Sequence, residues 1–398
     1  MKTSLSLVIL CGGKGKRLGN ITKKIAKPLI RINKKPFIEY LINFYQRYEF
    51  DKIYLIGHYK SSQFKRAFSK KEFNFIKCKF IKEKEAMDTG GALNSIRNKI
   101  KGNMVVINGD SYLNYNYLKF DNFNIKNNSH SMILVKNFNY NSNKKLINLK
   151  IKNKLIIKTK ISNYMNAGIY FFKKNIFNII PKNKKSSLEN DILPLLINRK
   201  KIKGIYSNDF FIDIGLKKNL NAAKKNLKKV IEKPAIFIDR DGVMNKDTGY
   251  AHKFKEMIWI KSSLNLLKKL SKKEIKLFIV TNQSGIARGI YSEGTFLNLH
   301  KKIKEFLISE NIFIDEVKYC PHHPKFGNKK YKVNCKCRKP NNKMLKDLID
   351  YWNIKSNKSI MLGDKKSDFI SAKKTNIKFY YSNLKNINKI NKFYRNLI

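Results

Sequence analysis

Residues 235–245 read AIFIDRDGVMN, four apolar residues followed by an acid pair and a glycine. The apolar run predicts a buried strand, so Asp239 and Asp241 stand where that strand ends. Side chains at the carboxyl ends of strands in an α/β sheet project into the crevice where such sheets bind ligands. Asp239 could therefore attack phosphorus and form an aspartyl phosphate, while Asp241 could transfer a proton to the leaving group. A simple turn can carry the same pattern, and the surrounding residues decide between the two interpretations.

Two apolar runs further along the chain end in the same way. Residues 276–281 (KLFIVT) end at Thr281, whose hydroxyl could bond a phosphoryl oxygen, and residues 359–363 (SIMLG) are followed by Asp364. Lys339 could balance the charge on phosphate and aspartate, and Mg²⁺ prefers oxygen ligands such as carboxylates. Together these groups are what phosphoryl transfer requires. We expect catalysis by Asp239, Asp241, Thr281, Asn282 and Lys339, and Mg²⁺ ligands in Asp239, Asp241 and Asp364, with Asp368 following as a further acid.

Three of the five cysteines lie close together in the sequence, beside two histidines. Cys320 and His322 form a C-x-H pair, and Cys335 and Cys337 form a C-x-C pair. In a cytosolic chain such a cluster indicates a metal before it indicates disulfides. Four protein ligands of this kind suit a tetrahedral zinc ion and leave no open position, so the zinc would be structural. It would tie its loop together and so position Arg338, next to Lys339, at the phosphate.

Longer segments of this half carry a specific resemblance. They are FIDRDGVMN, GYAH, VTNQSGIARG, YCPHHP, CxCRKP and MLGDKKSD, and they cover essentially all of residues 234–376. This half resembles the haloacid-dehalogenase (HAD) superfamily and, within it, the D-glycero-D-manno-heptose 1,7-bisphosphate 7-phosphatases. The histidinol-phosphate phosphatases share much of the pattern and are the alternative within the superfamily. The resemblance favours His322 over His323 as the zinc ligand. Arg288 and His252 are candidates for holding the second phosphate or the hydroxyls of the substrate, and a solvated loop position is the alternative for each.

The N-terminal half begins with an apolar run, residues 5–10, that ends at the glycine-rich turn CGGKGKRL, residues 11–18. Glycines there let backbone N–H groups approach phosphate oxygens without a Cβ in the way, and Arg17 could bind phosphates bidentately. The spacing matches neither the P-loop nor the dinucleotide-binding pattern, so the turn alone is weak evidence. The glycines expected at the phosphates are Gly12, Gly13 and Gly15.

Later residues of this half add weight to a nucleotide site. Lys27 follows at the spacing expected of a second phosphate contact, and Gly90 lies in a DTGGA loop before a helix. Asp110 follows the apolar run 104–108, and with Asp213 it could chelate one Mg²⁺ that bridges the α-phosphate and an incoming sugar phosphate.

Residues 5–223 as a whole resemble the sugar-1-phosphate nucleotidyltransferases, most of all the D-glycero-α-D-manno-heptose 1-phosphate guanylyltransferases. The resemblance rests on the glycine-rich turn, Lys27, the DTGGA loop, the two aspartates and the NAGIY segment that contains Asn166. It implies in-line attack of a sugar phosphate on the α-phosphorus of GTP, with release of pyrophosphate. It also implies that Asn166 and Lys160 contact the sugar phosphate, although Thr159 precedes Lys160 where a glutamate is expected.

The length of 398 residues suits two domains, and short apolar strands alternating with helical stretches predict α/β architecture in both. We expect a Rossmann-like domain with a mixed sheet at residues 1–232 and a HAD-like, doubly wound parallel sheet with a zinc-bound loop at residues 233–398. Strands in residues 114–160, rich in Asn and Lys, are placed only loosely. No run is long and apolar enough for a membrane span, and the N-terminal run lacks a cleavage site, so we expect a cytoplasmic protein.

Lys and Arg number 85 against 28 Asp and Glu, which gives a formal charge of +57. Such a balance is typical of proteins that bind nucleic acid. Here, however, lysines are spread through every segment together with Asn and Ile, and neither a basic tail nor a nucleic-acid-binding motif is present. We therefore expect small anionic substrates, with no specific nucleic acid and no membrane partner; the sequence leaves the oligomeric state open.

The two halves together predict a bifunctional enzyme of GDP-D-glycero-D-manno-heptose biosynthesis, with Mg²⁺ in both domains and structural Zn²⁺ in the second. The C-terminal domain would remove the 7-phosphate from the bisphosphate. The N-terminal domain would then join the heptose 1-phosphate to GMP from GTP, giving GDP-heptose for a surface polysaccharide. The alternatives from other classes are a nucleic-acid 3′-phosphatase or binding protein, suggested by the charge, and a sensor whose N-terminal half binds a sugar nucleotide without turnover.

Overall fold

The computed structural model describes residues 4–48, 50–69, 71–115, 129–136, 148–160, 162–273 and 275–395. The chain divides into two compact units, Met1–Leu227 and Lys228–Ile398. The units meet within the helix α7 (Lys217–Ile231), a few residues before the boundary at residue 232 that the sequence suggests. Among the described residues, none of the helices combines the length and the apolar character that crossing a membrane requires.

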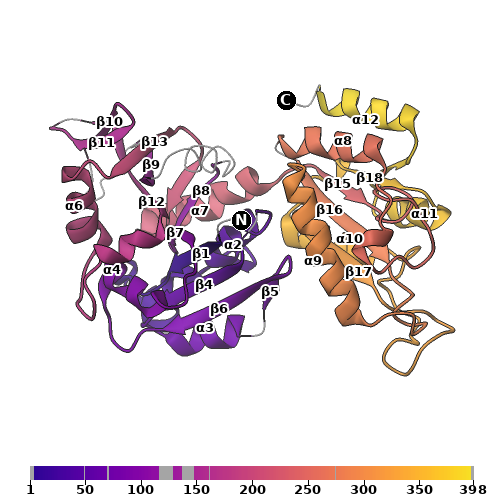
Figure 1. The fold of residues 1–398 in the computed structure, drawn as a ribbon, viewed down its shortest axis with the longest axis horizontal. Coiled ribbons are helices and arrows are strands. Elements are labelled where there is room, and N and C mark those ends of the chain that lie inside the picture. The colour runs from indigo at the N-terminus through magenta and orange to yellow at the C-terminus, as the bar shows by residue number, and fades with distance from the viewer. Residues whose placement is uncertain are drawn as a thin grey trace. The chain divides into compact units, whose positions relative to one another are not determined.

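The N-terminal unit is built on one mixed sheet (Figure 1). Its strands are β1 (Leu5–Leu10), β4 (Lys52–Gly57), β5 (Glu72–Phe73), β6 (Ile76–Lys82), β7 (Asn103–Asn108), β9 (His130–Lys136), β10 (Leu149–Lys152), β11 (Leu155–Lys158), β12 (Tyr164–Phe172) and β13 (Ile202–Ser207). They lie in the order β10-β11-β13-β9-β12-β7-β1-β4-β6-β5. β7, β1, β4 and β6 are parallel, and β12 runs antiparallel between β7 and β9.

Smaller elements of this unit surround the main sheet. Two short antiparallel pairs join β2 (Arg31–Ile32) to β3 (Lys35–Pro36) and β8 (Ser111–Leu113) to β14 (Phe211–Asp213). The α-helices are α1 (Asn20–Lys24), α2 (Phe37–Tyr45), α3 (Ser61–Phe68), α4 (Asp88–Ala92), α6 (Leu193–Asn198) and α7. The 3₁₀ turns are η1 (Lys16–Leu18), η2 (Lys27–Leu29), η3 (Leu93–Ile96) and η4 (Lys174–Asn178), and η5 (Leu188–Ile192) is a π-helical turn.

The C-terminal unit contains a five-stranded sheet that is parallel throughout. Its strands are β15 (Ala235–Ile238), β16 (Lys276–Asn282), β17 (Glu316–Cys320), β18 (Ile360–Gly363) and β19 (Lys378–Tyr381), in the order β17-β16-β15-β18-β19. The helices are α8 (Lys261–Ser271), α9 (Glu293–Ser309), α10 (Lys343–Trp352), α11 (Lys366–Lys373) and α12 (Leu384–Arg395), with short turns η6 (Phe254–Glu256) and η7 (Ser356–Lys358).

Helices cover both faces of this parallel sheet, which explains why its strands read as continuous apolar runs. In β15, Ile236 and Ile238 pack in one core with side chains of α8, α9 and α12, whereas Phe237 packs in the other with side chains of α10 and α11. The predicted fold class is therefore confirmed, with a mixed sheet in one unit and a doubly covered parallel sheet in the other.

The predicted elements differ from the observed ones mainly at their ends. The helix expected at residues 219–233 spans Lys217–Ile231, and the strand expected at residues 276–281 extends to Asn282. Of the loosely placed segment 114–160, β9, β10 and β11 are seen, while residues 116–128 and 137–147 lie outside the described residues.

Candidate active sites

In the C-terminal unit, a pocket of about 390 Å³ opens where β15, β16 and β18 end. These strands are neighbours and run parallel, so their carboxyl ends lie at one edge of the sheet. The pocket thus brings together side chains that are more than a hundred residues apart in the sequence. The sequence-predicted residues that line it are Asp239, Asp241, Thr281, Asn282, Arg338 and Lys339.

Asp239 and Lys339 form a buried ion pair at the centre of this site, with 3.0 Å between Oδ1 and Nζ. Lys339 Nζ also lies 2.7 Å from Asp368 Oδ1 and donates to the carbonyl oxygen of Val280 at 2.8 Å. Burial raises the pKa of Asp239 to about 7, although Lys339 opposes this. Burial lowers the pKa of Lys339, but the two aspartates outweigh burial and the net pKa is raised. Lys339 is therefore held charged where a phosphoryl group would add negative charge.

Asp239 of this pair also belongs to a group of three converging carboxylates, whose chemistry suits Mg²⁺. Asp239, Asp364 and Asp368 each offer an oxygen within 4.8 Å of the others. Asp364 Oδ1 is buried and accepts no hydrogen bond among the described residues, and burial raises the pKa of this carboxyl group. Gly242 leaves room for the Asp364 carboxylate, because a Cβ added to this glycine would lie 2.1 Å from Asp364 Oδ2. The φ of Gly242 is +82°. A buried acid cluster with an unpaired oxygen fits a divalent cation held by oxygen ligands.

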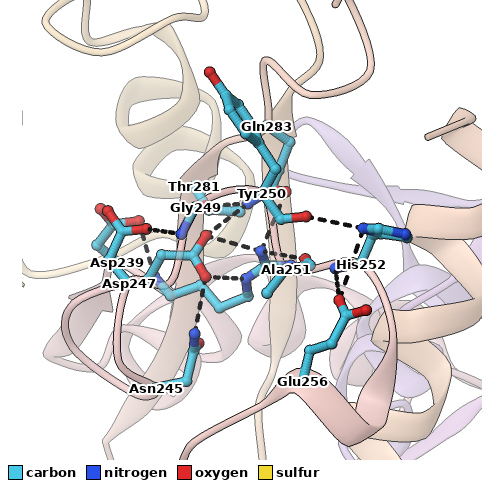
Figure 2. A network of polar contacts seen from close by, with 12 residues as sticks. Asp239, Asn245, Asp247, Gly249, Tyr250, Ala251, His252, Glu256, Thr281 and Gln283 are labelled. Atoms are coloured by element: carbon cyan, nitrogen blue, oxygen red, sulfur yellow. Dashed lines mark hydrogen bonds and ion pairs between the residues drawn. The ribbon is translucent and has the colours of Figure 1, made fainter. Parts of the chain in front are cut away.

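Asp241, which the sequence also assigned to Mg²⁺, has its carboxylate outside this acid cluster. Arg240 binds it side-on, with Nε 3.0 Å from Oδ1 and Nη2 2.8 Å from Oδ2, and Gln283 Nε2 donates to Oδ2 at 3.1 Å. Figure 2 shows this network around Asn245 and Gln283. Sequence reasoning did not single out Arg240 or Gln283. It named Asp368 only as a following acid, and the available signal was its position at the start of a helix, where it accepts from Lys365 N at 3.1 Å.

Thr281 and Asn282 lie at the end of β16 and contact different parts of the site. The hydroxyl of Thr281 is buried and accepts from Gln283 Nε2 at 2.9 Å. Asn282 holds the backbone of Lys339, since its Nδ2 donates to Lys339 O at 3.0 Å and its Oδ1 accepts from Lys339 N at 3.1 Å. Asn282 therefore positions the lysine from β16.

The predicted substrate contacts do not all reach the pocket. Arg338 lines it, and Arg338 Nη1 donates to the carbonyl oxygen of His322 at 3.2 Å. His252 stacks on Tyr291, with ring centroids 5.3 Å apart, and lies outside the lining. Arg288 is exposed and lies over the ring of Phe326, with 3.8 Å to the centroid, in a neighbouring hollow. The roles of His252 and Arg288 in binding substrate stay predictions.

The predicted zinc ligands converge at one point. The Sγ atoms of Cys320, Cys335 and Cys337 are 3.0–3.4 Å apart, and His322 Nδ1 lies 3.3 Å from Cys337 Sγ. These distances exceed the ~2.05 Å of a disulfide, so the thiols are free. His323 lies outside the cluster, where its Nδ1 accepts from Lys325 N at 3.1 Å. Three thiols and one imidazole nitrogen in this arrangement are a donor set that suits tetrahedral zinc.

In the N-terminal unit, a second pocket of about 260 Å³ lies at the carboxyl ends of β1 and β7. Among the predicted residues, Gly12, Gly13, Lys27 and Asp110 line it. Lys27 Nζ forms an ion pair with Asp110 Oδ2 at 2.5 Å. A cation beside an acid at a glycine-rich turn can hold phosphates and a metal ion in one place.

Asp213 reaches the same edge through the short β14–β8 pair. It lies opposite Ser111 in register, and the amide of Ile214 donates to the carbonyl oxygen of Asp110 at 2.9 Å. A Cβ added to Gly215 would lie 2.7 Å from Asp213 Oδ1 and 3.9 Å from Lys27 Nζ. The structure thus brings Asp213 close to Lys27 and Asp110, across a hundred residues of sequence.

Five other predicted residues are outside the lining of this pocket. Arg17 is exposed on η1, Lys160 is exposed after β11, and Gly15 has a φ of +63° beside Thr22. The amide of Gly90 donates to Ser186 O at 2.9 Å, so it is already engaged within the protein. Asn166 is buried and donates to the hydroxyl of Tyr170 at 2.7 Å. Contacts of these five to substrate stay predictions.

Comparisons with known proteins agree with the division into two units. A family model described as nucleotidyl transferase matches residues 6–230, and one described as haloacid dehalogenase-like hydrolase matches residues 209–381. The D-glycero-β-D-manno-heptose-1,7-bisphosphate 7-phosphatase of Pasteurella multocida is 42% identical over 146 residues, which cover 37% of this chain and 79% of that protein.

Two solved structures match the two parts separately. HddC from Yersinia pseudotuberculosis is 27% identical and covers 56% of this chain and 99% of that one, with a TM-score of 0.47. The D,D-heptose 1,7-bisphosphate phosphatase from B. bronchiseptica, complexed with magnesium and phosphate, is 28% identical and covers 37% of this chain and 79% of that one, with a TM-score of 0.34. On the family model and the Pasteurella relative, the chain belongs to the nucleotidyl transferase family in its N-terminal part and to the heptose-bisphosphate 7-phosphatase family of HAD-like hydrolases in its C-terminal part, and is a bifunctional enzyme.

Proposed function

We propose that the C-terminal unit hydrolyses the 7-phosphate of D-glycero-D-manno-heptose 1,7-bisphosphate, and that the N-terminal unit joins the resulting 1-phosphate to GMP from GTP. One observation carries the proposal. A unit that is 42% identical to a heptose-bisphosphate phosphatase shares its chain with a nucleotidyltransferase. The product of the first reaction has the phosphate at C1 that the second reaction requires. No observation favours the histidinol-phosphate phosphatase, nucleic-acid or sensor alternatives.

In the phosphatase reaction, we assign the attack on phosphorus to Asp239. A bond forms between its carboxylate oxygen and phosphorus as the bond to the sugar O7 breaks, and O7 takes a proton from Asp241. Asp241 then accepts a proton from water, which attacks the aspartyl phosphate and releases inorganic phosphate. Lys339, 3.0 Å from Asp239, favours the ionised form of the nucleophile against the effect of burial and neutralises phosphoryl oxygens, while Thr281 supplies a hydroxyl at the end of the neighbouring strand.

Asp239, Asp364 and Asp368 are the side chains that we expect to hold Mg²⁺, because their oxygens already converge and one of them lacks a hydrogen-bond donor within the described residues. Bound there, Mg²⁺ would offset the mutual repulsion of the carboxylates and the phosphate. The sequence-based assignment of Asp241 to Mg²⁺ stays a prediction, since its two oxygens already accept from Arg240 and Gln283.

In the nucleotidyl transfer, an oxygen of the sugar phosphate attacks the α-phosphorus of the nucleotide and pyrophosphate leaves. The work of the protein is mainly positioning and charge neutralisation. We assign the triphosphate to the Gly12–Gly13 turn and Lys27, which line the pocket, and Mg²⁺ to Asp110 and Asp213.

Glu83 supports guanine as the base. Its side chain lines the pocket and is buried, and Oε2 faces Gly12, where an added Cβ would come within 3.0 Å. Guanine presents two adjacent N–H donors that one carboxylate can accept, whereas adenine presents an acceptor nitrogen beside its amino group. Glu83 Oε1 already accepts from Met87 N at 3.4 Å, but Oε2 placed opposite that acceptor nitrogen would be left unpaired, so this pocket favours guanine.

The anomer of the sugar is a separate question. The Pasteurella relative is named for the β-anomer of the bisphosphate, whereas the resemblance of the N-terminal half implies the α-anomer of the 1-phosphate. Because the two units would act on one sugar in turn, both must accept the same anomer, and we propose the α-anomer for this chain.

The coupled reaction tests the function directly. With Mg²⁺, the α-bisphosphate and GTP, the purified protein is expected to release orthophosphate and pyrophosphate and to form GDP-heptose. Parallel reactions replace GTP by ATP and the α-anomer by the β-anomer, and products are separated by ion-exchange chromatography and identified by mass. Turnover with ATP alone would contradict the assignment of Glu83 to guanine. Orthophosphate without any pyrophosphate would contradict the transferase and leave a sensor.

Zinc in the cysteine cluster gives a second expected result. Protein purified without chelators is expected to hold about one zinc ion per chain, measured by plasma mass spectrometry, because four ligands converge. Cys335→Ser should lose the metal, lower the unfolding midpoint of the C-terminal unit by several degrees and reduce phosphatase activity. Cys78→Ser, a buried cysteine outside the cluster, is the control and should keep the zinc. Zinc-free wild-type protein with full phosphatase activity would rule out the site.

A further inference from the structure

Arg240 stands in the sequence between the two aspartates of the phosphatase site, and among the described residues it is the largest side chain that is fully buried, at 1% exposure. A buried guanidinium costs several kcal/mol unless it is paired and its N–H groups find acceptors. An apolar side chain in the same place would avoid that cost, so packing alone does not explain an arginine here. The groups that Arg240 bonds indicate what it contributes.

The groups that bond Arg240 lie in three parts of the unit: the loop after β15, the residue that follows β16, and α9. Its Nε and Nη2 hold Asp241 side-on, and Nη2 also donates to the carbonyl oxygen of Ala251 at 3.3 Å and to Gln283 Oε1 at 3.2 Å. Nη1 lies 3.3 Å from His300 Nε2 on α9. Since a guanidinium has no acceptor, His300 Nε2 must accept, and burial together with Arg240 lowers the pKa of this histidine. The guanidinium is thereby fixed from several sides.

Asp241 in turn is held through both of its oxygens. Besides Arg240, Asn245 Nδ2 donates to Oδ1 at 3.0 Å and Gln283 Nε2 donates to Oδ2 at 3.1 Å. The amide of Gln283 can point only one way, because its Oε1 already accepts from Tyr291 Oη at 2.7 Å and from Arg240. Four donors therefore set the plane of this carboxylate, while a fifth of its side chain stays exposed, in the lining of the pocket.

We propose that Arg240 is a positioning residue for the phosphatase reaction: with Gln283, it orients the Asp241 carboxylate so that one oxygen faces the leaving oxygen of the substrate. This inference rests on the proposed role of Asp241 as the proton donor and acceptor. Arg240 acts through Asp241 and does not touch the phosphoryl group. Its loss should therefore slow the reaction most where the leaving group needs a proton.

The dependence on the leaving group provides the test. Arg240→Lys keeps the positive charge but cannot hold both oxygens of Asp241 side-on. It is expected to lower kcat/KM for the sugar bisphosphate, whose leaving group is an alkoxide, by about 10²-fold, because kcat/KM covers the steps up to loss of the leaving group and omits the later attack of water. For 4-nitrophenyl phosphate, whose leaving group departs without a proton, kcat/KM should fall by less than about threefold. A distorted nucleophile or phosphate site would slow both substrates alike and would overturn the proposal.

Two further variants separate this inference from the proposed function. Asp241→Asn should show the same selective loss in kcat/KM, although its kcat should fall for both substrates because Asp241 also accepts the proton of the attacking water. Arg240→Lys added to it should cause no further loss, because residues that act through one group are not additive. If Asp241→Asn lowers kcat/KM equally for both substrates, the role of Asp241 as the proton donor itself fails. If it is selective but Arg240→Lys is not, only the positioning role fails.

A milder variant tests the same inference in case Arg240→Lys does not fold. Tyr291→Phe removes only the hydroxyl that orients Gln283, and it should lower kcat/KM for the bisphosphate several-fold with little change in kcat/KM for the aryl phosphate. If circular dichroism shows that Arg240→Lys is unfolded, the proposal is overturned when Tyr291→Phe and the wild type have equal kcat/KM values for both substrates.

Discussion

Asp239→Asn is expected to abolish phosphate release from the bisphosphate and to leave nucleotidyl transfer from supplied heptose 1-phosphate unchanged. The amide cannot attack phosphorus, so the phosphatase rate should fall by at least about 10⁴-fold, as for the loss of other nucleophiles. The side chain keeps its volume, and the neutral amide relieves repulsion from Asp368 and Asp241, which both raise the pKa of Asp239. Orthophosphate release and pyrophosphate release are measured separately on the same preparation.

A matched control comes from another buried aspartate of the same unit. Asp315 is fully buried, pairs with Lys276 at 2.9 Å and does not line the pocket. Asp315→Asn should lower the unfolding midpoint while the remaining folded protein keeps its kcat. If Asp239→Asn also eliminated nucleotidyl transfer, the two sites would not be independent. If it kept phosphatase activity, Asp239 would not be the nucleophile.

Asp110→Asn should have the opposite effect, with nucleotidyl transfer reduced by about 10³-fold or more and the phosphatase unaffected. Asp110 lines the nucleotide pocket and pairs with Lys27 at 2.5 Å, and it lies close to Asp213. Its loss removes one of two carboxylates assigned to Mg²⁺ and leaves the charge of Lys27 less well balanced. Pyrophosphate release from GTP and heptose 1-phosphate, measured over a range of Mg²⁺ concentrations, provides the readout.

Asp51→Asn is the control for this variant, because it removes a carboxylate of the same unit outside the pocket, where Asp51 accepts from Leu5 N at 3.0 Å. It should leave transfer at the wild-type rate. Full transfer by Asp110→Asn at low Mg²⁺ would contradict the assignment of this residue to the metal. Loss of phosphatase activity in the same variant would point to misfolding.

Much of the phosphatase site could be predicted because each group follows a strand. Asp239, Thr281 and Asp364 end or follow apolar runs that stand out in the sequence, and parallel strands bring their carboxyl ends to one edge. The same reasoning led to Asp110 after β7. The cluster that we assign to zinc could be predicted for another reason, since Cys and His at such short spacings indicate a metal site.

The residues that sequence reasoning missed or misplaced are those whose contacts depend on packing between distant elements. Arg240 is one of many basic residues, and only its burial against α9 and the 249–251 segment distinguishes it. Gln283 lies in the VTNQSGIARG segment, which assigned it no role, and Glu83 lies in none of the quoted segments. Conversely, Gly90 lies in the DTGGA loop that the sequence assigned to substrate binding, but its amide donates to the carbonyl oxygen of Ser186, nearly a hundred residues away.

By itself, the sequence determined the fold class, the pairing of a nucleotidyltransferase with a phosphatase, and the groups at the strand ends, because these depend on local periodicity and on the chemistry of short motifs. Only the tertiary structure decided how the acids are arranged. It gathers Asp368 with Asp239 and Asp364, and it turns the carboxylate of Asp241 toward Arg240 and Gln283. The direction in which a carboxylate points is set by donors from other elements, and those contacts exist only once the chain has folded.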